Sequence, residues 1–292
     1  MRPSQIQGEQ YGKKSLKDVC NSAVELEAYL ISKADNHNCY KTYSTVNRVQ
    51  SWLDENYIYL DDGSGWNDVN DRNLFNSYRG NIKQFGRCFS FSKSESVAMW
   101  MLYGGLQKKG AMLEFSQKAM RELVNNTKQV VLGNWINHRF IPVVTLTEGQ
   151  FRLFLKDILY IGDRDSRGVY IKRSDEAVKD APPTVIDQLE RCTKHSAWSY
   201  ENECRLILSV DKGLLANYPP ASSAQVSLMD LAEKQKYLTT YCAPNFEGTK
   251  PYLPSRISGI IDWNLCKECP QVEELNKRLH VLETALQEHI TV

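Results

Sequence analysis

The chain has 292 residues, of which 42% are hydrophobic, 24% are charged and eight are cysteines, and its formal net charge is +1. This composition is typical of a globular protein with one large domain or two small ones. It excludes a strong overall field toward nucleic acid or membrane, a small disulfide scaffold, and any run near the roughly 18 apolar residues of a membrane span. Because residues 1–15 also lack an apolar secretion signal, we expect a cytoplasmic protein with mostly reduced cysteines and no membrane contact.

The first part of the chain predicts a helical lead-in. Its first 14 residues show no apolar pattern. Ser15 and Asp18 form a capping box, and apolar residues then follow helical spacing to about Lys33. Residues 35–38 are rich in Asn and Asp, which predicts that the helix ends in a loop.

Short β-prone segments alternate with helices through the middle of the chain. Strands are expected at residues 39–43, 57–60, 87–92, 110–115, 130–135 and 140–147, and helices at about 46–53, 97–103 and 117–125. Residues 61–71 predict a loop and contain Trp66, which either packs down or waits for a ligand. Residues 151–161 are apolar and fit either a helix or a strand.

The second half of the chain is less regular. Residues 163–183 are charged and poorly patterned, so we interpret them as an excursion from the sheet. Helices are expected at about 184–192 and 228–237, a late strand at 257–261, and a final helix after Pro270 with an apolar stripe from Val272 to Ile290. The predicted organisation is a lead-in over residues 1–34, a single α+β domain over 35–265 and a C-terminal helix over 266–292.

The stretch from Trp198 to Leu208 carries charged residues at alternate positions of a β-prone run. Side chains on a strand alternate between its two faces. We therefore expect Glu201, Glu203 and Arg205 on one face, and the core face to hold Cys204, Leu206 and Leu208. Carboxylates on a buried strand are costly to hide without partners. The pattern predicts a polar cleft with the two glutamates at its floor; the alternative is a strand with one solvated face.

Two other predicted strands also present polar faces. Lys41 shares a face with Tyr43, and Ser90 shares a face with Ser92. A basic or aromatic anchor, a hydroxyl pair and an acid are the parts needed to hold a dinucleotide and to activate a glycosidic bond, because a carboxylate can stabilise an oxocarbenium-like ribose. An aromatic residue such as Trp100 or Tyr103 could stack on the nicotinamide ring.

The order of these motifs resembles a bacterial family of domains of unknown function whose members often lie near phage-defence genes. The resemblance runs from about Tyr40 to Val210, and its specific parts are the Met99-Trp100 pair and the block from Trp198 to Arg205. It implies a toxin of a toxin-antitoxin, anti-phage defence system.

The same order is similar to the ADP-ribosyltransferase fold, in which a basic or His residue on an early strand, a Ser-Thr-Ser-like strand and a Gln/Glu-x-Glu strand bind NAD. The similarity implies an α+β fold with a split mixed or antiparallel sheet core and flanking helices, and NAD as the substrate. By position, Glu203 is the catalytic acid and Glu201 orients the acceptor, while the residues expected to bind NAD are Lys41, Tyr43, Ser90, Ser92, Trp100, Tyr103 and Arg205. Lys41 stands where the family has His or Arg, and Phe91 stands in place of the central Thr. The acceptor is a macromolecule, either RNA, DNA or protein.

Other functions remain open from the sequence alone. One alternative is a nuclease or other hydrolase that uses His195 with the two glutamates, and another is a module that senses a nucleotide without turnover. Cys266 and Cys269 have metal-ligand spacing, and Cys192 with His195 could complete a zinc site, but we expect reduced bystander cysteines and no metal. A toxin also needs neutralising, so we expect an antitoxin protein as partner, docking on the final helix.

Overall fold

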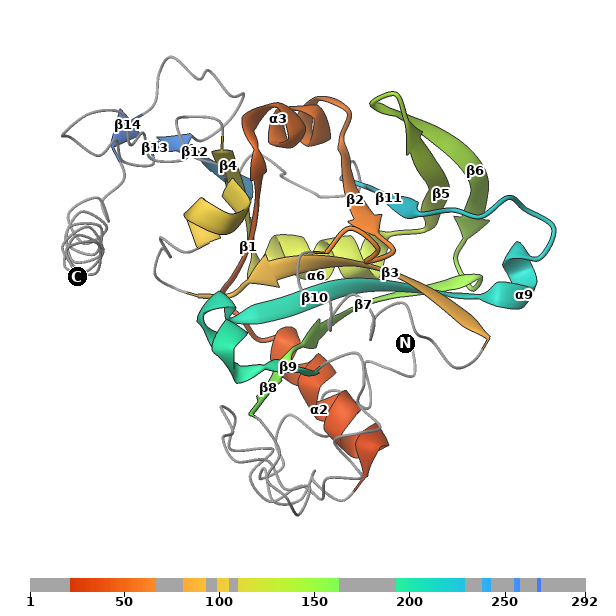
Figure 1. Cartoon of the computed structure of the whole chain (residues 1–292), viewed down its shortest axis with the longest axis horizontal. Coiled ribbons are helices and arrows are strands. Elements are labelled where there is room, and N and C mark those ends of the chain that lie inside the picture. The colour runs from red at the N-terminus through yellow and green to blue at the C-terminus, as the bar shows by residue number, and fades with distance from the viewer. Residues whose placement is uncertain are drawn as a thin grey trace, which may run out of the picture.

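A large antiparallel sheet organises the computed structural model (Figure 1). The structure describes residues 22–66, 81–92, 99–104, 110–162, 193–228, 238–242, 255–257 and 267–268. In these residues the strands of the large sheet are β1 (Cys39–Thr45), β2 (Tyr57–Asp61), β3 (Ile82–Ser90), β4 (Gly110–Ser116), β5 (Gln129–Ile136), β6 (Arg139–Thr147), β7 (Phe151–Asp157), β10 (Glu203–Asp211), β11 (Ser223–Ser227), β12 (Leu238–Cys242), β13 (Ser255–Ile257) and β14 (Lys267–Glu268). A separate parallel pair is formed by β8 (Leu159–Ile161) and β9 (Thr193–His195).

Helices join and flank these strands. They are α2 (Ala23–Ala34), α3 (Val46–Asp54), α6 (Gln117–Asn126) and α9 (Lys212–Leu215), with a π-helical turn η2 (Trp100–Gly104) and a 3-10 turn η3 (Ser196–Glu201). Two strands run directly into helices because their last residue is a good N-cap. Thr45 ends β1 and accepts from the N–H of Arg48 in α3, and Ser116 ends β4 and accepts from the N–H of Ala119 in α6.

β10 lies at the centre of the sheet's most extensive pairing. It bonds to β3 along one edge and to β7 along the other. Cys204, Leu206 and Leu208 are fully buried in the main hydrophobic core, as their alternation predicts. Arg205 is also fully buried, so the second face of β10 is covered too and is not the solvated face of the alternative interpretation.

The sheet is split between β1 and β3. These two strands pair only at Lys41 and Ser90, whereas β1 pairs along its whole length with β4. β2 meets β3 only where Asp61 faces Gly86. The backbone therefore leaves an opening between these two meeting points, and polar side chains of three strands turn toward it.

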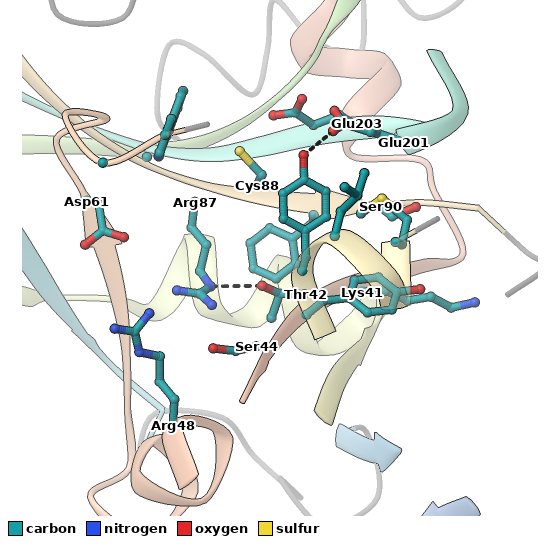
Figure 2. A pocket seen from close by; sticks show the side chains of 18 of the residues that line it. Lys41, Thr42, Ser44, Arg48, Asp61, Arg87, Cys88, Ser90, Glu201 and Glu203 are labelled. Carbon is teal, nitrogen blue, oxygen red and sulfur yellow. Dashed lines mark hydrogen bonds between the residues drawn. The ribbon is translucent and has the colours of Figure 1, made fainter. Parts of the chain in front are cut away.

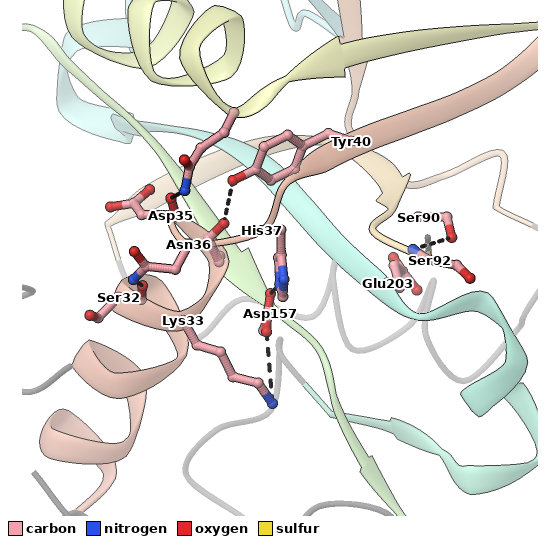
Figure 3. A network of polar contacts seen from close by, with 12 residues as sticks. Ser32, Lys33, Asp35, Asn36, His37, Tyr40, Ser90, Ser92, Asp157 and Glu203 are labelled. Carbon is pink, nitrogen blue, oxygen red and sulfur yellow. Dashed lines mark hydrogen bonds and ion pairs between the residues drawn. The ribbon is translucent and has the colours of Figure 1, made fainter. Parts of the chain in front are cut away.

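A network of polar contacts joins the connection between α2 and β1 to β7, beside the start of β10 (Figure 3). The rings of His37 and Phe91 stack at 3.7 Å, and His37 Nε2 lies 2.7 Å from Asp157 Oδ1. Phe91 in turn donates its backbone N–H to the carbonyl of Asn202, the residue between the two glutamates. Burial raises the pKa of the nearby Asp35 carboxyl to about 6. The network therefore fixes the turn that enters β10.

Most of the elements predicted in the first half of the chain are present. The domain is α+β with an antiparallel, curled sheet, as expected, and residues 151–161 are the strands β7 and β8. The pattern missed α9, β9, β11, β12 and β14, which are only two to five residues long. Several predictions lie outside the described residues: the capping box at Ser15, the excursion at 163–183, and the helices at 184–192, 228–237 and after Pro270. No helix among the described residues is long and apolar enough to cross a membrane.

Candidate active site

A pocket of about 300 Å³ occupies the opening of the sheet (Figure 2). Its volume is at the lower end of the range for small-molecule sites. Its walls come from β1, α3, β2 and the loop after it, β3, η2, β9 and the turn into β10. The lining residues with charged or hydroxyl side chains are Lys41, Thr42, Tyr43, Ser44, Arg48, Asp61, Arg87, Ser90, Tyr103, Lys194, Glu201 and Glu203. Residues more than 160 positions apart in sequence therefore share one cavity.

Three of the predicted site residues form one row across neighbouring strands. Lys41 of β1 pairs with Ser90 of β3, and Ser90 pairs on its other side with Glu203 of β10. Residues directly opposite each other in antiparallel strands point to the same face, so all three side chains face the pocket. All three are also buried, and the Lys41 amine lies 3.7 Å from Glu114 of β4.

Glu201 does not lie on the strand, so the predicted common face of Glu201, Glu203 and Arg205 is wrong in detail. Glu201 ends the η3 turn, and Asn202 follows in the left-handed conformation with φ of 44°. Asn is one of the few non-glycine residues that adopt this conformation readily. The turn at Asn202 nevertheless brings both carboxylates to the pocket wall, where each is bonded to the same lysine.

That lysine is Lys194 of β9, which sequence reasoning did not identify as a site residue. Its amine lies 2.6 Å from Glu201 Oε2 and 3.1 Å from Glu203 Oε2. Arg205 Nε donates to Glu203 Oε1 at 2.5 Å, and its guanidinium group lies over the ring of Trp66 at 4.5 Å. Two carboxylates and two cations thus form a buried, charge-balanced group, which is the arrangement that makes buried charges tolerable.

The pKa values of the two glutamates are shifted in opposite directions. Burial alone would raise the pKa of Glu203, but the Arg205 guanidinium and the Lys194 amine outweigh it and lower that pKa well below its usual range. Burial raises the pKa of Glu201 to about 7, the neighbouring Glu203 charge adds to the rise, and Lys194 opposes it. The site therefore combines a carboxylate that stays ionised with a second carboxyl that titrates near neutral pH.

Two tyrosines contact the glutamates, and one of them, Tyr103, lines the pocket. Tyr103 of η2 donates its hydroxyl to Glu201 Oε1 at 2.6 Å, and the Tyr160 hydroxyl accepts the backbone N–H of Glu203 at 2.9 Å. Burial and the adjacent carboxylates raise the pKa of both phenols, so both stay protonated. Tyr103 therefore acts as a hydrogen-bond donor to the acid.

The opposite end of the pocket carries two arginines (Figure 2). Arg87 of β3 donates to the Thr42 hydroxyl and to the Tyr59 carbonyl, both at 3.0 Å, and lies 3.9 Å above the Trp52 ring. Burial lowers the pKa of Arg87 to about 10, so it remains charged at neutral pH. Arg48 of α3 is exposed beside it and makes no ion pair with any residue that the structure describes.

The remaining predicted residues lie in different positions. Tyr43 lines the pocket, whereas Trp100 is fully buried against Tyr43 and Met112 and is not part of the pocket wall. The backbone N–H of Ser92 donates to the Ser90 hydroxyl at 3.4 Å, but Ser92 itself lies beyond the lining. Trp100 is therefore a core residue that packs against the pocket-lining Tyr43 and does not line the pocket itself.

The hydrolase alternative needs His195 beside the two glutamates, and the structure does not bring His195 to this pocket. His195 is exposed, accepts the backbone N–H of Ala197 on Nδ1, and is absent from the lining. Among the described residues no group of three or more His, Cys, Asp and Glu side chains could hold a metal ion. The proposed zinc ligands Cys192, Cys266 and Cys269 lie outside the described residues.

Comparison with known proteins gives one family. A family model described as a protein of unknown function, DUF2971, matches residues 99–206. No curated protein and no solved structure matches the chain. The chain is thus similar to a family of domains of unknown function, as expected, over a segment that contains Tyr103, Lys194 and both glutamates but not Lys41 or Ser90.

Proposed function

We propose that the protein is an NAD-consuming ADP-ribosyltransferase that uses this pocket. The observation that carries the proposal is the row of Lys41, Ser90 and Glu203 on three neighbouring strands at the split of the sheet. The ADP-ribosyltransferase resemblance assigns a basic residue, a hydroxyl and the catalytic acid to these positions. Their adjacency across the sheet supports this assignment.

The charge distribution of the pocket supports a dinucleotide as the ligand. Arg48 and Arg87 at one end suit the negatively charged pyrophosphate, since guanidinium groups bind phosphate oxygens strongly. The ionised Glu203 at the other end suits a ribose that develops positive charge. NAD carries negative charge on its pyrophosphate and develops positive charge on one ribose during the reaction. Its charges therefore complement those at the two ends of the pocket.

The reaction follows from these roles. The bond between the ribose C1′ and the nicotinamide nitrogen breaks, and its electron pair leaves with nicotinamide as a neutral ring. Glu203 stabilises the oxocarbenium-like ribose. A nucleophile of the acceptor then bonds to C1′ and gives up its proton to Glu201, whose raised pKa near neutrality suits a general base. Water in place of the acceptor gives free ADP-ribose.

Several further features stay predictions from the resemblance. They are the macromolecular acceptor, the antitoxin partner and the role in phage defence. The cytoplasmic location stays a prediction from the sequence composition. The final helix on which an antitoxin is expected to dock lies outside the described residues. Deleting the residues after Pro270 and testing co-purification of a partner would test that prediction.

Labelled NAD incubated with the protein and a cell lysate tests the proposed function. Separate protease and nuclease digestions then show whether the label sits on protein or on nucleic acid. The expected result is transfer by the wild type and none by Glu203→Gln. Transfer by Glu203→Gln at the wild-type rate contradicts the assignment, and cleavage of nucleic acid without NAD favours the hydrolase instead.

A further inference from the structure

Lys194 joins the two glutamates of the pocket from a separate strand pair. β9 runs parallel to β8 with Lys194 opposite Tyr160, and the Lys194 side chain is only 6% exposed. Its amine is within hydrogen-bonding distance of both Glu201 and Glu203. One ammonium group therefore contacts both acids, although they come from different elements.

The other oxygens of the two carboxylates are held by different groups. Glu203 Oε1 accepts from Arg205, and Glu201 Oε1 accepts from Tyr103. Each carboxylate is thus bonded through both oxygens, which fixes the plane of the group. Lys194 is the contact that the two acids share, so it sets their position relative to each other.

We infer that Lys194 is a positioning residue, whose ammonium group holds Glu201 and Glu203 in one arrangement and acts on the substrate through them. The roles of the two acids in the reaction rest on the proposed function. The contacts of Lys194 with both acids are observed whatever the reaction is.

The charges around Glu201 support this role. Besides Lys194 and each other, the two acids face these titratable groups in the described part of the chain: Arg205 on β10, Tyr103 on η2, Tyr160 on β8, Tyr200 on η3 and Cys88 on β3. Arg205 is bonded to Glu203, so Lys194 is the cation that lowers the pKa of Glu201. Loss of this amine raises that pKa, and Glu201 then keeps its proton at neutral pH.

The test compares Lys194→Met with Lys194→Arg, using NAD as the probe and nicotinamide release as the measurement. Lys83→Met is the matched control, because Lys83 makes an ion pair with Asp62 at 3.0 Å and lies outside the pocket. We expect kcat of Lys194→Met to fall about 100-fold, the loss typical of misplaced catalytic groups. KM for NAD should stay within about threefold, and the acidic limb of the pH profile should move up by about one unit or more. Lys194→Arg should recover part of kcat, and Lys83→Met should match the wild type.

Two kinetic results would overturn the inference. A rise in KM with unchanged kcat would make Lys194 a direct contact of the substrate. A loss of kcat with an unmoved pH profile would reduce it to a structural residue. Circular dichroism shows whether Lys194→Met folds, and Lys194→Gln, which also removes the charge, supplies the pH profile if it does not.

A second measurement does not depend on activity. The melting temperatures of the wild type, Lys194→Met, Glu201→Gln and the double variant form a double-mutant cycle. If Lys194 holds Glu201, the second substitution changes the melting temperature less when the first is present. Additive changes overturn the inference, whether or not the protein consumes NAD. A wild type that is inert toward NAD overturns the proposed function alone.

Discussion

The two ends of the pocket carry charge in opposite ways. At the acid end, Glu201 and Glu203 are buried and each lies within hydrogen-bonding distance of a cation. At the arginine end, Arg87 is bonded to neutral oxygens and stacks on an aromatic ring, and Arg48 is exposed. The Asp61 carboxylate offsets one of these two positive charges. The acid end is charge-balanced by the protein, whereas the arginine end keeps a positive charge turned to the cavity.

This difference separates the two tasks of a transferase. A buried, balanced group of charges is preorganised and reorganises little during a reaction, which is the property that stabilises a transition state. A positive charge that the protein leaves unbalanced attracts an anionic ligand, which is a property of binding. We therefore expect changes at the acid end to affect kcat and changes at the arginine end to affect KM.

The largest expected effect follows from Glu203→Gln. The amide keeps the shape of the side chain but removes the negative charge that stabilises the ribose, so kcat for nicotinamide release should fall by about 10²- to 10³-fold. Binding of ADP-ribose, measured by calorimetry, should persist because the arginine end is intact. Glu148→Gln is a suitable control, since Glu148 is exposed, pairs with Lys128 and lies outside the pocket lining. Equal losses in both variants would contradict the division of the pocket.

The pH dependence gives the next largest effect. The pKa of Glu201 is raised to about 7 by burial and by Glu203, so the ionised base is present above pH 7 and is lost as the pH falls. Transfer to the acceptor should therefore drop about tenfold for each pH unit below 7. Glu203, whose pKa is lowered, stays ionised over the same range and adds no limb. Glu201→Gln should remove the limb, and a flat wild-type profile between about pH 5 and 8 would rule out Glu201 as the base.

A smaller effect is expected at the arginine end. Arg48→Ala removes one charge-assisted hydrogen bond to phosphate, worth about 1.5 kcal/mol, so KM for NAD should rise about tenfold. Because Arg48 touches none of the acids, kcat should stay within about twofold. Arg139→Ala, which removes an exposed arginine of β6 outside the pocket, controls for the loss of positive charge. A fall in kcat instead of a rise in KM would contradict the assignment of the arginine end to substrate binding.

Much of the acid end could be predicted from the sequence, because it depends on short-range patterns. Alternation over residues 203–208 placed the core side of β10 correctly, and the same stretch contains the acid and Arg205. Glu201 was misplaced because a left-handed Asn202 interrupts the alternation, and a single Asn is a weak signal for that conformation. The error in secondary structure did not remove Glu201 from the pocket, since the turn and the strand open onto the same cavity.

Lys194 and the arginine end could not be predicted, because they depend on long-range pairing. Lys194 lies on a three-residue strand whose partner is residues 159–161, and no periodicity can be read in so short an element. Arg87 alternates with Phe89 and Phe91, so the pattern assigned it to an apolar face; its aliphatic stem and its stacking on Trp52 explain why it is tolerated there. The opening of the sheet between β1 and β3 has no local signature at all.

The smallest effect concerns Ser90, which lies in the row between Lys41 and Glu203. Ser90→Ala removes one neutral hydroxyl from the pocket, worth about 1 kcal/mol, so kcat/KM for NAD should fall about fivefold. Ser92 is the matched control, since its hydroxyl is not part of the pocket lining, and Ser92→Ala should leave kcat/KM within about twofold. Both variants keep the backbone hydrogen bond of Phe91 to Asn202, but Ser90→Ala also removes the acceptor of the Ser92 backbone N–H. A difference in kcat/KM therefore reports on the pocket when the two variants have equal melting temperatures. Equal effects in the two variants would mean that both serines only stabilise the end of β3. Ser90 would then have no role in binding NAD.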